Sequence, residues 1–211
     1  MSLKKYPTTR SGIFWYSFVM QVVVGIDEAG RGPLAGPVSV GAVSVQKSFD
    51  VEREFPGVAD SKKLSEKKRE VIFSMLEKRL HIGDVRFAVG FSSAQYIDKY
   101  GISQAIKRAL SEAVSVVAPE PHLVHVFLDG SLSAPSEYLS QETIIHGDDL
   151  VPVISLASIA AKVTRDRIMV DFAKKYPQYG FERHKGYGTL LHRSKLKECG
   201  LCDIHRRTFI H

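Results

Sequence analysis

Two adjacent acids, Asp27 and Glu28, stand at the end of an apolar run and are followed by glycines around an arginine. Residues 22–26 are rich in β-branched side chains and predict a buried strand that carries both acids to its C-terminal end. Carboxylates in that place can hold a metal ion, and Gly30 and Gly32, which lack a Cβ, let a phosphate approach the backbone. The alternative is that the acids merely end a strand and the glycines form an ordinary turn.

The adjacency of the two acids sets a geometric condition. Neighbouring residues of a strand point to opposite faces, so Asp27 and Glu28 share one site only if the chain bends after Asp27 or the metal lies at the strand end. The glycine-rich residues that follow are compatible with such a bend.

Two further acids follow apolar segments later in the chain. Asp129 comes after residues 123–128, and Asp148 comes after Ile144 and Ile145 and precedes a predicted helix. Four carboxylates with no cysteine or histidine cluster near them in sequence suit Mg²⁺ or Mn²⁺, and without a cation they would raise one another's pKa values. Two such ions about 4 Å apart would activate a water and stabilise the leaving oxygen of a phosphodiester, as in nucleases.

The composition indicates one globular domain, and the distribution of charge favours a polyanionic partner. The chain has 211 residues, 44% of them hydrophobic, which is enough to bury a core and excludes a largely disordered chain. It carries 29 Lys and Arg against 23 Asp and Glu, and a group of the cations lies between residues 184 and 207. This clustering favours a partner such as nucleic acid, whereas an evenly spread charge would serve only solubility.

The first residues imitate a secretory signal peptide, because Lys4 and Lys5 precede an apolar run over residues 13–20. That run continues into the acidic strand without a small-residue cleavage site, so we reject a signal peptide and expect a cytoplasmic protein with no membrane association. We assign residues 1–21 to an N-terminal extension and residues 22–211 to the domain, with a basic helical and loop portion from about residue 176 to 211.

Cys199, Cys202 and His205 could suggest a zinc or redox site. A structural zinc site normally needs four ligands, and a redox Cys-x-x-Cys pair belongs to a βαβ pattern that this segment lacks. We therefore expect reduced thiols without a metal.

The remaining periodicities predict an α/β domain with a mixed sheet. Alternation over residues 38–45 predicts a strand antiparallel to the first one, because the connection between them is short. Further strands are expected over residues 87–91 and 123–128, and helices over residues 65–80, 103–117, 155–175 and 190–198. The order of the strands in the sheet does not follow from these patterns.

Two helices carry marked faces. The apolar stripe of the first predicted helix consists of Val71, Ile72, Met75, Leu76 and Leu80. The helix over residues 155–175 has a small face that should pack closely on the sheet, made of Ala157, Ala160 and Ala161. We expect its charged residues to point outward: Lys162, Arg165, Asp166 and Arg167.

Several ordered motifs resemble those of ribonuclease HII, the type 2 ribonuclease H family. They span residues 22–209 and comprise residues 25–37, 60–65, 128–130, 157–167, 179–189 and 205–209. The resemblance implies a ribonuclease H-like fold: a mixed five-stranded sheet flanked by helices, with a small C-terminal helical portion.

The resemblance also implies an activity. It would be hydrolysis of the RNA strand of RNA–DNA hybrids and incision of duplex DNA at embedded ribonucleotides, with Mg²⁺ or Mn²⁺, two ions during catalysis and no organic cofactor. The products would carry 3′-hydroxyl and 5′-phosphate ends. The resemblance further implies a monomer that removes misincorporated ribonucleotides and RNA primers.

Site residues carry over by position. Asp27, Glu28 and Asp129 match the metal-binding acids of the family, and Asp148 matches the fourth through its Gly-Asp step. Asp149 and Asp166 are alternatives for the fourth ligand. We prefer Asp148, because Asp149 would face differently and Asp166 lies one helical turn after a lysine that can pair with it.

The substrate contacts carry over in the same way. The Gly30-Arg31-Gly32 segment matches the element that contacts a ribose 2′-hydroxyl through its backbone, the group that distinguishes RNA from DNA. Tyr187 matches the tyrosine that packs on the sugar at the junction; alternatively it is a loop aromatic that covers the core, although its glycine neighbours favour exposure. The residues implied to contact phosphates are Ser61, Lys62, Lys63 and Lys185.

Other interpretations remain. Ribonuclease HIII would share the acids and the fold but usually lacks the arginine-centred loop and has an N-terminal binding domain. A non-catalytic nucleic-acid-binding module would explain the basic charge, but it would have no use for four acids that repel phosphates. A metal-binding structural domain is a weaker alternative. The chain departs from the family pattern at Gly101 and Leu156, where we expect local changes only.

Overall fold

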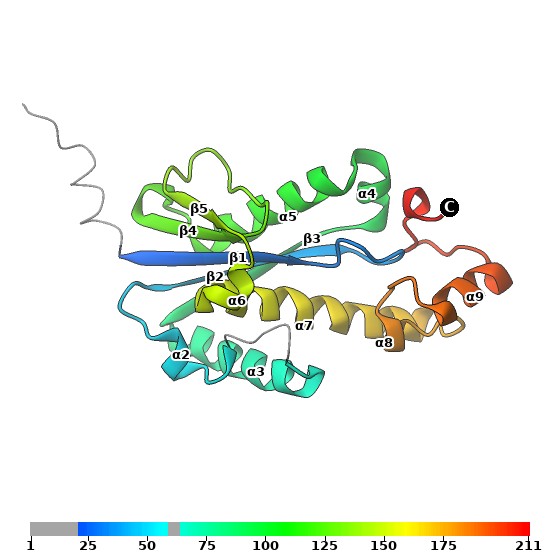
Figure 1. Cartoon of the computed structure of the whole chain (residues 1–211), viewed down its shortest axis with the longest axis horizontal. Coiled ribbons are helices and arrows are strands. Elements are labelled where there is room, and N and C mark those ends of the chain that lie inside the picture. The colour runs from blue at the N-terminus through cyan, green and yellow to red at the C-terminus, as the bar shows by residue number, and fades with distance from the viewer. Residues whose placement is uncertain (1–20, 59–63) are drawn as a thin grey trace, which may run out of the picture.

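The computed structural model describes residues 21–58 and 64–211. In these ranges a five-stranded sheet with the order β3-β2-β1-β4-β5 is covered by helices on both faces (Figure 1). The strands are β1 (Val22–Ala29), β2 (Val38–Gln46), β3 (Val85–Ser92), β4 (Val124–Asp129) and β5 (Gln141–Ile144). The α-helices are α2 (Val51–Glu54), α3 (Glu66–Ile82), α4 (Ala94–Tyr100), α5 (Ile102–Val117), α6 (Gly147–Leu150), α7 (Pro152–Lys175), α8 (Phe181–His184) and α9 (Leu190–Cys199). Two short 3₁₀ helices are η2 (Pro121–Leu123) and η3 (Arg207–Phe209).

The strand pairing confirms the predicted mixed sheet. β1 runs antiparallel to β2, as the short connection predicts, and parallel to β4. The parallel ladder ends at the pair Ile26 and Leu128, so the next residues, Asp27 and Asp129, lie at the same edge of the sheet. Parallel strands deliver their C-terminal residues to one edge, and this topology brings together two acids that are far apart in sequence.

The core lies on both faces of the sheet. α5 packs on one face and α7 and α3 pack on the other (Figure 1). The small face of α7 lies directly on the strands, as predicted: a Cβ added at Gly41 of β2 would lie 2.2 Å from the Ala157 carbonyl oxygen. Glycine is therefore required at this position by the close approach of two backbones.

The predicted outward charges of α7 are wrong for two residues. Arg165 is completely buried and Asp166 is 8% exposed, whereas Arg167 is exposed and pairs with Glu70. The reason is that the loop after β1 and the C-terminal segment of the chain cover the second half of the helix. α7 also begins at Pro152, earlier than predicted, because proline is well suited to the first turn of a helix.

Other boundary and packing predictions differ in smaller ways. In α3, Ile72 and Leu76 are buried as predicted, but Val71 and Leu80 are exposed because only one side of the helix contacts the domain. Gly101 joins α4 to α5 with a φ of 81°, and Leu156 is fully buried in the core beneath the sheet.

The basic C-terminal portion forms a small core of its own against the end of α7. α8 and α9 contribute to it, together with residues 202–206 (Figure 1). Residues 1–20 of the assigned extension lie outside the described residues. No helix in the described ranges combines the length and the apolar character needed to cross a membrane.

Candidate active site

The four predicted acids line one cavity of about 400 Å³ at the C-terminal edge of β1 and β4. Asp27 and Glu28 come from the end of β1, Asp129 from the end of β4, and Asp148 from α6. The other lining residues are Ala29, Gly30, Arg31, Gly32, Arg69, Ser158, Ile159, Lys162 and Tyr187. The structure thus brings the acids, the glycine-rich segment and the tyrosine into one cavity.

Asp27 and Glu28 reach one cavity because they lie at the end of the strand. The chain does not bend after Asp27. Regular pairing of β1 with β2 continues past Glu28 to Ala29, while the pairing with β4 has already ended at Ile26. Both acids therefore reach the cavity from the last residues of a regular strand.

A hydrogen-bonded turn places Asp148. The Asp129 Oδ1 atom accepts hydrogen bonds from the backbone N–H groups of Gly147, at 2.7 Å, and of Asp148, at 3.4 Å. These contacts hold α6 against the end of β4, so the third acid positions the fourth. Asp149 is exposed and does not line the cavity, and Asp166 pairs with Lys162 at 2.9 Å, as its spacing predicts. The geometry favours Asp148 over both alternatives.

Burial and the repulsion of neighbouring carboxylates raise the pKa values of Asp27 and Glu28. Burial raises the pKa of Asp27 to about 7, against a hydrogen bond from the Ser158 side chain, and the charges of Glu28 and Asp129 raise it further. Burial also raises the pKa of Glu28, although the Arg31 guanidinium, 3.1 Å from its carboxylate, opposes the shift. A divalent cation would remove this penalty by favouring the charged forms.

The chemistry of the donors fits Mg²⁺ or Mn²⁺, because all four are carboxylate groups. Across residues 21–58 and 64–211, however, no three or more His, Cys, Asp or Glu side chains are already placed to hold an ion. Asp27 accepts the Glu28 N–H at 2.7 Å, and Glu28 pairs with Arg31.

Two buried arginines donate hydrogen bonds to the backbone of the glycine-rich segment and of the residues that follow it. Gly30 has a φ of 87°, and a Cβ there would lie 2.1 Å from the Arg165 Nε atom. Arg165 donates hydrogen bonds to the carbonyls of Pro37, at 2.9 Å, and Ala35, at 3.2 Å. Arg206 donates to the Gly30 carbonyl at 2.7 Å. Arg165 was expected to point outward and Arg206 was assigned only to the basic C-terminal portion, and no local pattern predicts the burial of either.

Tyr187 stands at the rim of the cavity. It is 41% exposed, which confirms the predicted exposure, and two cations lie over its ring. The Lys162 Nζ atom is 5.7 Å and the Arg165 Cζ atom 5.8 Å from the ring centroid. Lys162 was interpreted only as an outward charge, although its position one helical turn after Ser158 could have indicated that it shares the cavity.

The described member of the residues predicted to contact phosphates lies outside the cavity. Lys185 does not line the cavity: it is 8% exposed, and its ammonium donates to the Glu182 carbonyl and lies 3.7 Å from Glu66. Its local partners account for its position. Ser61, Lys62 and Lys63 lie outside the described residues. Cys199 and Cys202 are free thiols.

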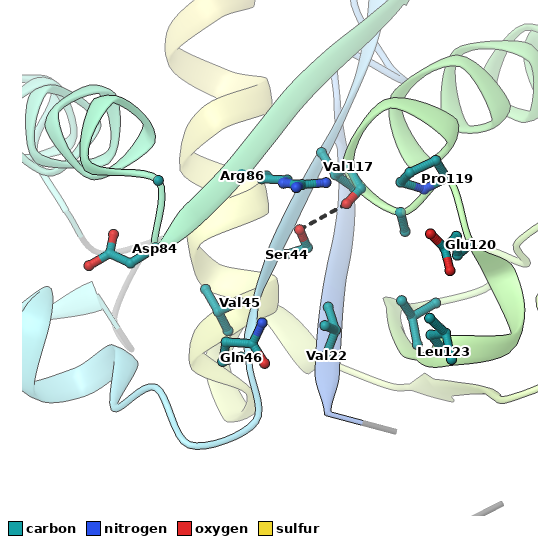
Figure 2. A pocket seen from close by; sticks show the side chains of 13 residues that line it. Val22, Ser44, Val45, Gln46, Asp84, Arg86, Val117, Pro119, Glu120 and Leu123 are labelled. Carbon is teal, nitrogen blue, oxygen red and sulfur yellow. Dashed lines mark hydrogen bonds between the residues drawn. The ribbon is translucent and has the colours of Figure 1, made fainter. Parts of the chain in front are cut away.

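A second cavity of about 240 Å³ lies at the opposite end of the strands (Figure 2). It is lined by Val22 and Val124, which begin β1 and β4, and by Arg86 and Glu120. The Ser44 hydroxyl donates a hydrogen bond to the Val117 carbonyl at 3.0 Å and so ties the end of α5 to β2 (Figure 2). This cavity is separate from the four acids.

Comparison with known proteins agrees with this geometry. The family model of Ribonuclease HII matches residues 24–211. The chain is 44% identical over 188 residues to ribonuclease HII of Ruminiclostridium cellulolyticum, a match that covers 89% of this chain and 69% of that protein.

Solved structures show the same fold. The structure of ribonuclease HII from Archaeoglobus fulgidus, determined in complex with PCNA, superposes with a TM-score of 0.73 and 26% identity, covering 90% of this chain and 96% of the other. A ribonuclease HIII determined in complex with Mn²⁺ superposes with a TM-score of 0.60 at 18% identity, over 94% of this chain and 69% of the other, which supports the fold alone.

Proposed function

Because the chain belongs to the ribonuclease HII family, and so to the metal-dependent endonucleases that cleave RNA in RNA–DNA hybrids, we propose that it also incises duplex DNA at single embedded ribonucleotides. The observation that carries the proposal is one cavity that combines four acids, the Gly30-Arg31-Gly32 backbone and Tyr187. The products would carry 3′-hydroxyl and 5′-phosphate ends. The cellular role would be removal of misincorporated ribonucleotides and RNA primers, by a monomer in the cytoplasm.

The proposed mechanism divides the cavity between two tasks. Asp27, Glu28, Asp129 and Asp148 would hold Mg²⁺ or Mn²⁺. When bound, two such ions would supply an activated water and stabilise the leaving oxygen. The chain's own contribution is to hold the scissile ribose, with the backbone of Gly30 and Gly32 for the 2′-hydroxyl and Tyr187 for the sugar. The Lys162 ammonium adds positive charge where a phosphate would lie.

A neighbouring cavity would extend the contact with the nucleic-acid backbone. It measures about 220 Å³ and shares Arg31 with the acidic cavity. Among the described residues its polar lining contains two cations and three hydroxyl groups and no carboxylate: Arg31, Lys107, Ser103, Ser131 and Ser133. Such a lining suits phosphate oxygens, which supports a duplex that runs from the acids across Arg31.

The activity is tested with labelled duplexes that carry one ribonucleotide, a full RNA–DNA hybrid, or DNA only. With Mg²⁺ or Mn²⁺ we expect cleavage of the first two and no cleavage of the third, and chelation should abolish both activities. Ligation of the upstream product to a 5′-phosphorylated strand would demonstrate its 3′-hydroxyl. A pure, folded protein that cleaves the hybrid but leaves the single ribonucleotide intact would refute the finer proposal.

Tyr187→Ala should lower kcat/KM at a single ribonucleotide by about tenfold or more, because the sugar loses the ring on which it packs. Tyr187→Phe keeps the ring and should stay within about threefold of the wild type. Initial rates on the duplex with one ribonucleotide measure both. Equal rates for the alanine variant and the wild type would exclude the packing role.

A further inference from the structure

Three buried histidines lie in the small C-terminal core, beside the segment that carries Tyr187. His184, His192 and His205 are 8%, 0% and 2% exposed. The rings of His184 and His192 stack with centroids 4.4 Å apart, and Phe181 packs against all three. Neither the acids nor the proposed chemistry uses these imidazoles, and buried polar groups need hydrogen-bond partners, so their partners are found within the fold.

The contact of His192 with Tyr187 fixes which nitrogen of His192 carries the proton. The His192 Nδ1 atom lies 2.9 Å from the Tyr187 carbonyl oxygen, which can only accept a hydrogen bond. Nδ1 therefore carries the hydrogen. In a neutral imidazole the other nitrogen, Nε2, must then be an acceptor.

The contacts of His205 independently give the same direction for the hydrogen bond between His205 and His192. The Cys202 backbone N–H donates to the His205 Nδ1 atom at 2.8 Å, and the Cys202 thiol lies 3.2 Å from the same nitrogen. The Cys202 carbonyl is farther from it, at 3.3 Å, and already accepts the His205 backbone N–H at 3.0 Å. The short contact therefore makes Nδ1 an acceptor, and the His205 Nε2 atom carries the hydrogen. The two Nε2 atoms of His205 and His192 are 3.1 Å apart, a distance suited to one donor and one acceptor. We call this directed path from Cys202 through His205 and His192 to Tyr187 the histidine relay.

The surroundings keep the relay neutral. Burial lowers the pKa of His192 to about 4 and also lowers the pKa of His205, with His184 opposing a charge on either ring. His184 is itself engaged, because the Gly186 N–H donates to its Nδ1 atom and its Nε2 atom contacts the Tyr179 carbonyl. A proton added to His192 would bring two N–H groups face to face between the rings.

Arg206, the residue after His205, binds the glycine-rich segment that lines the same cavity as Tyr187. Its buried guanidinium donates to the carbonyls of Gly30 at 2.7 Å, Arg31 at 2.9 Å and Gly36 at 2.9 Å. Every nitrogen of the fork thus has a partner in one loop. Of these two consecutive residues, Arg206 therefore contacts the glycine-rich segment directly, and His205 reaches the backbone of Tyr187 through His192.

We propose that residues 202–206 are a positioning element for substrate recognition, in which the histidine relay holds the backbone of Tyr187 and Arg206 holds residues 30–36. The element fixes the distance between the 2′-hydroxyl contact and the sugar-packing ring. This inference rests on the proposed function for its consequence in catalysis, while the hydrogen-bond direction stands on the geometry alone.

The test compares two amide variants at one position. The amide nitrogen of Asn can replace the His192 Nδ1 atom and donate to the Tyr187 carbonyl, whereas that of Gln replaces Nε2 and leaves the carbonyl without its donor. On the single-ribonucleotide duplex we expect His192→Asn to keep kcat within about twofold and His192→Gln to lower it about tenfold, with KM little changed in both. Thermal midpoints of both variants, measured in parallel, identify any loss caused by unfolding.

At position 205 we expect the Gln variant, and not the Asn variant, to keep the higher kcat. His205→Gln keeps a donor at the Nε2 position and should retain kcat, and His205→Asn should lose it. Arg206→Lys keeps the charge but cannot contact three carbonyls, so it should lower kcat while leaving the two histidine tautomers unchanged. Equal kcat values for the Asn and Gln variants at both positions would overturn the positioning role.

A spectroscopic measurement separates the relay from the proposed function. Long-range ¹H–¹⁵N correlation spectra of the full chain at neutral pH should show His192 protonated on Nδ1 and His205 on Nε2. Detection of His192 protonated on Nε2, or on both nitrogens, would overturn the relay even if the enzyme is active. Conversely, the expected tautomers in a protein that does not incise single ribonucleotides would refute the proposed function and leave the relay intact.

Discussion

Asp27→Asn should lower the rate of incision by about a thousandfold or more while making the metal-free protein more stable at alkaline pH. The amide keeps the size of the side chain and can still accept the Glu28 N–H, but it removes a negative oxygen from the acids that would hold the cation. Incision of the single-ribonucleotide duplex under saturating Mg²⁺ or Mn²⁺ measures the first effect.

The stability effect follows from the pKa of Asp27, which burial raises to about 7 from an ordinary value of 3.8. Between these values the folded state binds more protons than the unfolded state, so this group makes the metal-free fold less stable as the pH rises from about 4 to 7. An asparagine cannot ionise, so the Asp27→Asn variant does not lose this free energy of unfolding. The loss in the wild type is on the order of 2–4 kcal/mol at pH 8. At pH 4, close to the ordinary value of 3.8 and well below 7, almost all of this loss is absent, so the difference should be small.

Urea unfolding in the presence of a chelator, at pH 4 and pH 8, measures this difference. Divalent cations should raise the thermal midpoint of the wild type more at pH 8 than at pH 5, and should have little effect on Asp27→Asn. Asp149→Asn is the matched control, because Asp149 is exposed beside the site and does not line it. Unchanged incision by Asp27→Asn would rule out the assigned role of this acid.

Gly25→Ala should destabilise the fold by about 3 kcal/mol or more. The new Cβ would lie 2.3 Å from both the carbonyl carbon and the oxygen of Val153 and 2.6 Å from the Ile154 nitrogen. These are backbone atoms at the start of α7, so no side-chain rotation can relieve the clash. The whole helix has to move from the sheet, and with it Ser158, which lines the active-site cavity.

Gly32→Ala provides the control for stability. Among the described residues, no atom beyond the two chain neighbours of Gly32 lies within 4 Å of a Cβ placed there, so the free energy of unfolding should change by less than about 0.5 kcal/mol. Denaturant unfolding of both variants gives the comparison. A change of similar size in the two variants would show that close packing of α7 on β1 does not determine the requirement for glycine.

Local patterns were sufficient for much of the fold. The β-branched run of β1, the alternation in β2 and the helical periodicity of α5 depend on neighbours in sequence, and each element was predicted close to its observed position. The acids at strand ends were predictable for the same reason, since the end of an apolar strand is a local feature. The ribonuclease HII resemblance added the expectation that those acids share one site and the segments expected to contact the substrate.

Burial of charge could not be predicted in this way. Arg165 and Lys185 look like surface cations in sequence, and Arg206 belongs to a basic tail, yet all three are buried. Arg206 contacts Gly30 across 176 residues and Arg165 contacts Pro37 across 128. Their carbonyl partners repeat in every peptide unit, so no side-chain pattern marks which of them a guanidinium will meet.

The sequence by itself determined the first four strands, the four longest helices and the positions of the acids and the glycine-rich segment along the chain, because each depends on residues a few positions apart. It did not predict the short elements β5, α4, α6 and α8. Only the tertiary structure decided the strand order that places Asp27 beside Asp129, and the return of residues 202–206 to the cavity. Both result from packing between distant segments: the parallel pairing of β1 with β4, and buried hydrogen bonds that become favourable once water is excluded around them.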